Sequence, residues 1–191
     1  ENYKKEKTIL LLPGSRDQEI KMILPTMISI VNEFQDYKFI IAAAPSQKIT
    51  TYEKYIKNNN VEIIQNKTYK LLKNCKAAIV TSGTATLETA LFKVPQIVCY
   101  KSSWITYFIG KILIKNLKYI SLVNLIANKL IVKELIQNHC NKDNLAKELR
   151  IILDKNHREK IIQSYNELEV VLGGKGASNK TAKYIYNYLV E

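Results

Sequence analysis

The amino-acid sequence predicts an α/β fold in which a parallel sheet carries helices on both of its faces. Short apolar runs alternate with segments of helical periodicity through the first hundred residues, a pattern typical of βαβ units joined by right-handed crossovers. Two of these runs end in a glycine-containing turn, where a buried strand would give way to a helix. With 191 residues the chain can bury one substantial core. One domain is therefore expected.

Five strands are expected in the first part of the chain, over Thr8–Leu12, Tyr37–Ala44, Val61–Gln65, Ala77–Val80 and Gln96–Tyr100. Helices are expected between them, over Asp17–Phe34, Ser46–Lys57, Lys67–Asn74 and from Thr84 to about Phe92. Pro25 should kink or divide the first of these helices, and Ser46 should cap the second.

The pattern changes after Tyr119. An extended piece over 119–122 should precede helices over 132–139, 142–153 and 157–172, and a glycine-rich break should precede a last helix that Ser178 caps and that ends near Leu189. We expect residues 1–191 to form one ligand-binding domain with a helical extension over 156–191. Because the chain opens at Glu1 and not at Met, we also expect a domain cut from a longer protein.

The composition excludes several classes of site. Lysine and arginine outnumber aspartate and glutamate by 29 to 17, a net charge of +12 that attracts nucleic acid, anionic lipid or phosphorylated substrates without deciding among them. Three cysteines (Cys75, Cys99, Cys140) and two histidines (His139, His157) show no metal-type spacing and no catalytic arrangement. The odd cysteine count favours a reduced, cytoplasmic compartment, and no apolar run has membrane-spanning length.

The stretch Ala77–Glu88 predicts a phosphate site. An apolar run breaks at Thr81-Ser82-Gly83-Thr84 and resumes as a helix, and a helix start offers unpaired N–H groups and a positive dipole end. Glu88 follows Thr84 by about one helical turn, where a carboxylate can accept from ribose hydroxyls. The alternative is an ordinary helix that Ser82 or Thr84 caps.

A second turn of this kind follows the first expected strand. Gly14 permits close backbone approach, and the Arg16 guanidinium could hold a phosphate through two hydrogen bonds; the alternative is a structural turn with Arg16 paired to Asp17 or Glu19. Parallel strands bring their carboxyl ends to one edge, so both turns could share one diphosphate. The G-x-G-x-x-G and G-x-x-x-x-G-K-S/T motifs are absent, which argues against a nicotinamide dehydrogenase or a typical NTPase.

Residues 101–118 have the composition of a helix at a membrane interface. On a helix, lysines and aromatic side chains would flank an apolar arc, as interfacial helices require; the candidates are Trp104, Tyr107, Lys111, Lys115 and Lys118. The alternative is that the apolar arc packs on the sheet and the lysines are merely solvated.

Together these segments resemble lipid-A-disaccharide synthase, a bacterial glycosyltransferase of the GT-B type. The resemblance rests on L-L-P-G-S-R-x-x-E-I (11–20), T-S-G-T-A-T-L-E (81–88), V-P-Q-I-V-C-Y-K (94–101), S-L-V-N-L-I (121–126), V-K-E-L-I-Q (132–137) and L-G-G-K-G-A-S (172–178). These motifs occur in the family's order over nearly the whole chain. One position departs from the family pattern: this chain has Val123 where many relatives have proline.

The resemblance implies the C-terminal, UDP-holding half of a GT-B fold, a Rossmann-like domain with extra C-terminal helices. The family transfers 2,3-diacylglucosamine from its UDP derivative to 2,3-diacylglucosamine 1-phosphate. The implied donor-binding residues are Gly14, Ser15 and Arg16 at the diphosphate, Ser82, Gly83 and Thr84 at the helix end, Glu88 at the ribose and Asn124 near the diphosphate and sugar.

The family's proposed base belongs to the other half, so the resemblance assigns this chain no catalytic residue, and no metal or cofactor. We expect the isolated chain to bind UDP weakly without turnover. The expected partners are the UDP-2,3-diacylglucosamine donor, the acylated glucosamine 1-phosphate acceptor in the intact enzyme and the inner membrane of a Gram-negative bacterium, reached from the cytoplasm; no nucleic acid is expected, and a homodimer is left open.

Two other functions remain as alternatives. One is another GT-B-like UDP-sugar enzyme, an epimerase or a peptidoglycan glycosyltransferase. The other is a non-catalytic basic module that binds RNA or a membrane surface, which would need a contiguous basic stripe and exposed stacking aromatics.

Overall fold

A computed structural model describes residues 7–56, 61–102, 118–174 and 176–190. Its centre is a six-stranded sheet of order β3-β2-β1-β4-β5-β6 in which every neighbouring pair is parallel. The strands are β1 (Thr8–Leu12), β2 (Lys38–Ala43), β3 (Val61–Gln65), β4 (Ala77–Thr81), β5 (Gln96–Tyr100) and β6 (Lys133–Ile136). The predicted fold class is confirmed.

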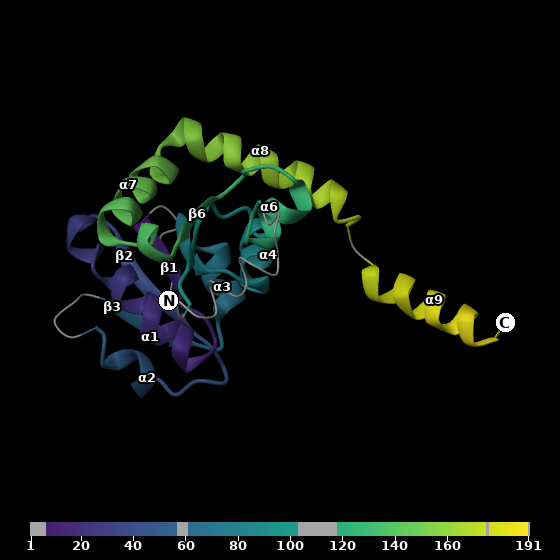
Figure 1. Ribbon diagram of the computed structural model, residues 1–191, viewed down its shortest axis with the longest axis horizontal. Helices are drawn as coiled ribbons and strands as arrows, with labels where there is room; N and C mark the ends of the chain where they lie inside the picture. The colour runs from purple at the N-terminus through teal and green to yellow at the C-terminus, as the bar shows by residue number, and fades with distance from the viewer. Residues whose placement is uncertain (1–6, 57–60, 103–117, 175, 191) are drawn as a thin grey trace.

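Helices cover both faces of the sheet (Figure 1). They are α1 (Asp17–Ile28), α2 (Thr50–Glu53), α3 (Thr68–Lys73), α4 (Thr84–Leu91), α6 (Leu122–Ala127), α7 (Lys142–Leu153), α8 (Lys155–Val171) and α9 (Ala177–Val190), with 3₁₀ turns η2 (Val31–Glu33) and η3 (Gln137–His139). Strands β2 and β3 lie on one side of β1, and β4, β5 and β6 on the other. The order of the strands therefore reverses between β1 and β4, where open α/β sheets bind their ligands.

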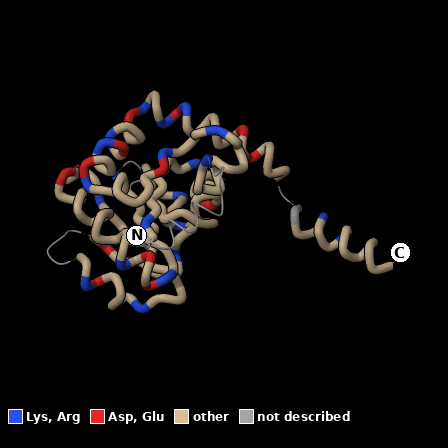
Figure 2. Tube along the Cα trace, viewed as in Figure 1, with Lys and Arg blue, Asp and Glu red and all other residues tan. Residues whose placement is uncertain are grey.

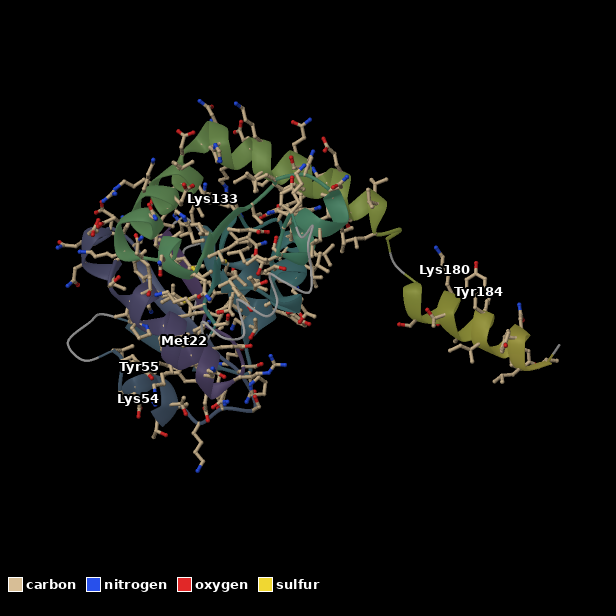
Figure 3. All side chains as sticks on the ribbon, viewed as in Figure 1. Met22, Lys54, Tyr55, Lys133, Lys180 and Tyr184 are labelled. Atoms are coloured by element: carbon tan, nitrogen blue, oxygen red, sulfur yellow. The ribbon has the colours of Figure 1, made fainter. Side chains whose placement is uncertain are left out.

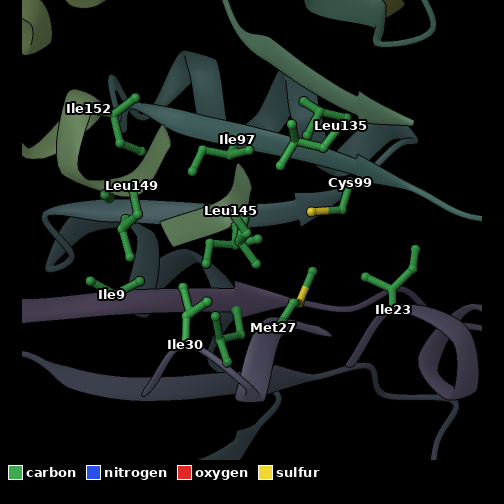
Figure 4. Close-up of a cluster of buried hydrophobic side chains, with 14 of the residues drawn as sticks. Ile9, Ile23, Met27, Ile30, Ile97, Cys99, Leu135, Leu145, Leu149 and Ile152 are labelled. Carbon is green, nitrogen blue, oxygen red and sulfur yellow. The ribbon is translucent and has the colours of Figure 1, made fainter. Parts of the chain in front are cut away.

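The core has two parts because alternate side chains of each strand point to opposite faces. On one face, Ile9 and Leu11 of β1 pack with the buried sides of α1, α7 and α8; Figure 4 shows Leu145, Leu149 and Ile152 of α7 set against this face of the strands. On the other face, Leu10 and Leu12 join residues of α3. The three cysteines are buried within these two clusters.

Three predictions in the first half of the chain need correction. The helix expected over 46–57 is only α2, with Ile49 as its N-cap. Ser46 does not cap it, because the Ser46 hydroxyl and the Gln47 amide both donate to the backbone oxygen of Ser15. The helix expected over Asp17–Phe34 ends at Ile28 and is followed by the separate 3₁₀ turn η2, so the interruption comes after Ile28 and not at Pro25, which lies inside α1. A kink at Pro25 stays a prediction.

The segment after residue 119 also differs from the prediction. Residues 119–122 lead directly into α6, whose N-cap Ser121 accepts from Asn124 N. The helix expected over 132–139 is strand β6, which pairs with β5, followed by η3. Val132 and Leu135 are both buried three residues apart, a spacing that a helix would also produce. Pairing with β5, which is distant in sequence, makes this segment a strand and not a helix.

The last helix extends away from the rest of the molecule (Figure 1). It begins at Ala177, so Ser178 lies within it and is not its N-cap. Gly173 and Gly174 have φ angles of +77° and +67°, a left-handed conformation that ends α8. In Figure 3, Lys180 and Tyr184 project from α9 with the body of the protein at a distance. That residues 156–191 form an extension to one domain stays a prediction.

Candidate functional site

One cleft of the described structure lies at the carboxyl edge of the sheet where the strand order reverses. Its volume is about 540 Å³. The turns after β1, β2 and β4 and the first residues of α3 and α4 line it: Leu12, Gly14, Ser15, Arg16, Glu19, Ala42, Ala44, Pro45, Thr68, Thr81, Ser82, Gly83, Thr84, Ala85 and Glu88. Seven of the eight predicted donor-binding residues are in this set, and Asn124 is not. Both predicted glycine turns thus face one space.

The turn after β4 leaves the start of α4 open to the cleft. Gly83 is the N-cap, and no side-chain hydrogen bond caps this helix. A Cβ at Gly83 would meet no described atom within 4 Å beyond its chain neighbours, so nothing described crowds this position. The Ser82 hydroxyl turns away to donate to Ile120 O at 3.0 Å. The alternative of a helix capped by Ser82 or Thr84 is therefore wrong, and the positive end of α4 faces the cleft.

Thr81 adds a second polar group at this point. The residue is 6 % exposed, at the carboxyl end of β4. Within the described part of the chain, its Oγ1 has no hydrogen-bond partner. A buried hydroxyl without a partner is unfavourable, so Thr81, a residue of the cleft lining, carries an unused donor and acceptor on an oxygen that is itself buried.

The turn after β1 is arranged differently, because a carboxylate occupies its donors. Glu19 Oε2 accepts from Ser15 N at 3.1 Å and from Arg16 N at 3.4 Å, and Glu19 Oε1 accepts from Arg16 Nη1 at 3.1 Å. Gly14 has φ +105°, which favours glycine. The structural alternative, pairing of Arg16 with Glu19, is present. It does not remove Arg16 from the cleft, since the Arg16 side chain remains 82 % exposed.

Glu88 lies one helical turn into α4 and is half-buried. It lines the cleft and also a neighbouring depression of about 590 Å³, where it shares the wall with Lys67, Tyr69 and Lys70 of the α3 region. Tyr69 is 57 % exposed and its ring stacks on Phe92 at 5.5 Å between centroids. Glu88 therefore lies between two adjacent spaces that share part of their lining, with a carboxylate available to hydroxyl donors.

The structure does not bring Asn124 to the cleft lining. Its side chain is fully buried between α6 and β6. Nδ2 donates to Val132 O and Glu134 Oε1, both at 2.8 Å, and Oδ1 accepts from Ile131 N and Val132 N at 2.8 and 3.0 Å. All the hydrogen bonds that an amide side chain ordinarily makes are used inside the protein. Its contact with a sugar stays a prediction that these bonds do not favour.

The predicted membrane-interface residues fall mostly outside the described residues: Trp104, Tyr107, Lys111 and Lys115. Lys118 is described and exposed, and its Nζ lies 5.4 Å from the centre of the Tyr119 ring. None of the described helices is long and apolar enough to cross a membrane. Within those same residues no group of three or more His, Cys, Asp or Glu side chains could hold a metal ion.

Sequence reasoning missed part of the cleft. The turn after β2 contributes Ala44 and Pro45, and α3 contributes Thr68. None of them carries a charge or a glycine signal. The parallel order of β2 beside β1 was the one available indication, because every strand end at this edge faces the same side.

Comparisons with known proteins show which family the chain belongs to. A family model described as lipid-A-disaccharide synthetase matches residues 2–188. Lipid-A-disaccharide synthase of Sulfurihydrogenibium sp. is 37 % identical over 206 residues, which cover 98 % of this chain and 53 % of that protein. The synthase of Persephonella marina is 35 % identical over 193 residues, covering 95 % and 51 %. The chain spans about half the length of the curated relatives it matches.

Solved structures share the fold at low sequence identity. The calicheamicin glycosyltransferase CalG4 aligns with a TM-score of 0.61 and 13 % identity over 97 % of this chain and 42 % of its own. The UDP-GlcNAc 2-epimerase from Neisseria meningitidis, bound to UDP-GlcNAc, aligns with a TM-score of 0.56 and 14 % identity over 95 % and 44 %. The fold is that of one half of a GT-B protein. By its family match and by these relatives, the chain belongs to the lipid-A-disaccharide synthetase family.

Proposed function

We propose that this chain is the donor-binding half of a lipid-A-disaccharide synthase and that it holds the UDP of UDP-2,3-diacylglucosamine in the cleft at the carboxyl edge of the sheet. The observation that carries the proposal is the uncapped start of α4, which lines the same cleft as the exposed Arg16 side chain. One feature supplies unpaired N–H groups and the other a permanent positive charge. A diphosphate matches both.

The diphosphate would lie over the start of α4. The backbone N–H groups of the first turn would donate to phosphate oxygens, with Arg16 pairing from the opposite turn through charge-assisted hydrogen bonds. The Thr81 hydroxyl lies in the same lining without a described partner. These groups favour a dianion over a neutral ligand.

Glu88 would hold the ribose. A carboxylate accepts from hydroxyl groups but repels phosphate, so a position one turn beyond the phosphate end of α4 suits a sugar. The depression beyond Glu88 offers the exposed face of Tyr69 to the rest of the nucleoside. The order from the start of α4 to Tyr69 would then follow the order phosphate, ribose, base.

In the intact protein, a hydroxyl of 2,3-diacylglucosamine 1-phosphate would displace UDP from the donor sugar. This transfer needs a base that takes the hydroxyl proton and a group that stabilises the negative charge on the leaving diphosphate. Arg16 and the start of α4 would serve the second need. The resemblance to the family places the proposed base in the other half of the protein, so the base would come from outside this chain; within it, Glu19 contacts the turn after β1 and Glu88 is assigned to the ribose. The chain alone would bind UDP without turnover.

Acyl chains on both substrates would place the enzyme at the cytoplasmic face of the inner membrane. Lysines of the 101–118 segment, including the exposed Lys118, would add attraction to anionic lipid of about 1 kcal/mol each. Flotation with anionic liposomes tests this part: binding should weaken at high salt, and binding equal to that of neutral liposomes would contradict it. Homodimer formation stays a prediction.

Isothermal calorimetry with UDP tests the donor site. Replacing Arg16 with alanine should raise the Kd roughly 10- to 100-fold, because a charge-assisted hydrogen bond contributes about 1.5–3 kcal/mol. Lys155→Ala, at an exposed position on α8, is the matched control that removes one positive charge outside the cleft. Absence of saturable binding, or equal Kd values for wild type and Arg16→Ala, would overturn the proposal.

A competition between UDP and RNA tests the alternative that the chain is a basic RNA-binding module. Charges of both signs alternate along α7 and α8 (Figure 2), whereas an RNA surface would need a stripe of one sign. Binding of RNA that UDP does not displace, together with no UDP binding, would favour the module.

A further inference from the structure

Glu19 is placed to control how Arg16 meets an anion. Its two carboxylate oxygens have different partners: Oε2 accepts from the backbone N–H groups of Ser15 and Arg16, whereas Oε1 accepts from the Arg16 guanidinium. One side chain therefore fixes both the backbone of the turn and the direction of its cation.

The carboxylate sits tightly under the turn. A Cβ added at Gly14 would lie 2.3 Å from Glu19 Oε2 and 2.8 Å from Glu19 Cβ, so only glycine leaves room for it. The Glu19 side chain is 25 % exposed. This packing restricts the Glu19 side chain to a narrow range of conformations.

The guanidinium keeps most of its capacity. Arginine has five N–H donors, of which Glu19 takes one on Nη1. The Arg16 side chain remains 82 % exposed and lines the cleft. An arginine whose guanidinium is already held by one hydrogen bond loses less conformational entropy when it binds a second anion.

The two turns of the cleft therefore differ in what they offer a ligand. At the turn after β1, Glu19 occupies the N–H groups of Ser15 and Arg16. At the turn after β4, no side chain caps α4. Backbone donors are thus available on the β4 side, while the β1 side offers mainly a side-chain cation.

We propose that Glu19 is a positioning residue that orients the Arg16 guanidinium toward the donor diphosphate; this rests on the proposed function of the cleft. The competing interpretation has the opposite sign. If the Glu19 carboxylate were an internal substitute for phosphate that the ligand must displace, then removing its charge would strengthen UDP binding.

The experiment is a double-mutant cycle with UDP and uridine as probes. Glu19→Gln keeps an oxygen for the backbone N–H groups but turns an amide N–H₂ toward the guanidinium, so it removes the grip on Arg16 and preserves the cap. UDP binding is measured by calorimetry for wild type, Glu19→Gln, Arg16→Ala and the double variant, and uridine binding by ligand-observed NMR. Glu159→Gln, at an exposed position of α8 outside the cleft, is the matched control.

Glu19→Gln should raise the Kd for UDP roughly 2- to 10-fold, the effect of freeing one side chain. It should leave uridine binding unchanged, because uridine has no phosphate, and it should have no further effect in the Arg16→Ala background. Glu19→Asp, which keeps the charge at the helix start but shortens the reach, should weaken UDP binding in the same direction and serves if Glu19→Gln does not fold.

Three outcomes would overturn the inference. Tighter UDP binding by Glu19→Gln would make the carboxylate a competitor. Equal weakening for UDP and uridine, or the same factor with and without Arg16, would show a merely structural role. A wild-type chain that binds no UDP would overturn the proposed function itself. This result is distinguishable from the other two, in which the wild-type chain binds UDP.

Discussion

Replacing Asn124 with alanine should destabilise the protein strongly, because this side chain joins α6 to the start of β6. Its amide makes four hydrogen bonds, with Ile131 N, Val132 N, Val132 O and Glu134 Oε1. Alanine satisfies none of them. Val132 is 1 % exposed, so water does not readily replace the lost partner of its backbone.

The magnitude follows from these bonds. At about 1 kcal/mol each, the loss of four hydrogen bonds gives a fall of about 4 kcal/mol in the free energy of unfolding. For a chain of this size each kcal/mol lowers Tm by about 2–4 °C, so Tm should fall by about 8–16 °C. Glu134 keeps the N–H groups of Ile120 and Ser121 as partners, which limits the loss on that side.

Urea unfolding followed by circular dichroism measures this effect. Asn166→Ala, at an exposed position of α8, is the matched control and should change the free energy of unfolding by less than about 0.5 kcal/mol. A loss below about 1 kcal/mol in Asn124→Ala would refute the structural role of Asn124. So would an equally stable variant that no longer binds UDP, since that result would assign Asn124 to the ligand.

Two further predictions concern the turn after β1 and the acid limit of stability. Gly14→Ala should lower the free energy of unfolding by about 1–3 kcal/mol from its positive φ alone and should weaken UDP binding, because its Cβ would displace Glu19; thermal melting and calorimetry measure the two effects, and an unchanged Tm would contradict the strain. The hydrogen bonds of Lys142 and then Arg150 lower the pKa of Glu33 from its usual 4.5. This stabilisation is present above about pH 4.5 and is lost as the pH falls through the lowered pKa, so Glu33→Gln should reduce the drop in Tm between pH 6 and pH 3, and identical drops would contradict it.

The strands near the centre of the sheet could be predicted because they are buried on both faces. The runs over β1, β4 and β5 consist almost entirely of apolar residues, as parallel strands covered by helices require. Strand β6 lies at the edge of the sheet, where Lys133 is exposed and Leu135 is buried. Its identity depends on pairing with β5, a contact that no local pattern contains.

The gathering of the two glycine turns in one cleft could also be predicted, since parallel strands end at one edge. The hydrogen-bond partners of the individual polar groups could not be predicted from the sequence. Asn124 lies among apolar residues in the sequence, a pattern typical of either a ligand contact or a buried side chain with internal hydrogen bonds. In the structure, its side chain makes internal hydrogen bonds. Glu19 was visible as a partner of Arg16, but its grip on the backbone of the turn depends on the close packing at Gly14.

Amide chemical-shift mapping during a titration with UDP tests the central claim most directly, because it locates the ligand. Saturable shifts should concentrate at Gly83, Thr84 and Ala85 and at the turn around Arg16, with the next-largest shift at Glu88. Saturable shifts that avoid the start of α4 and centre on the separate depression beside Lys101 and Gln137 would contradict it.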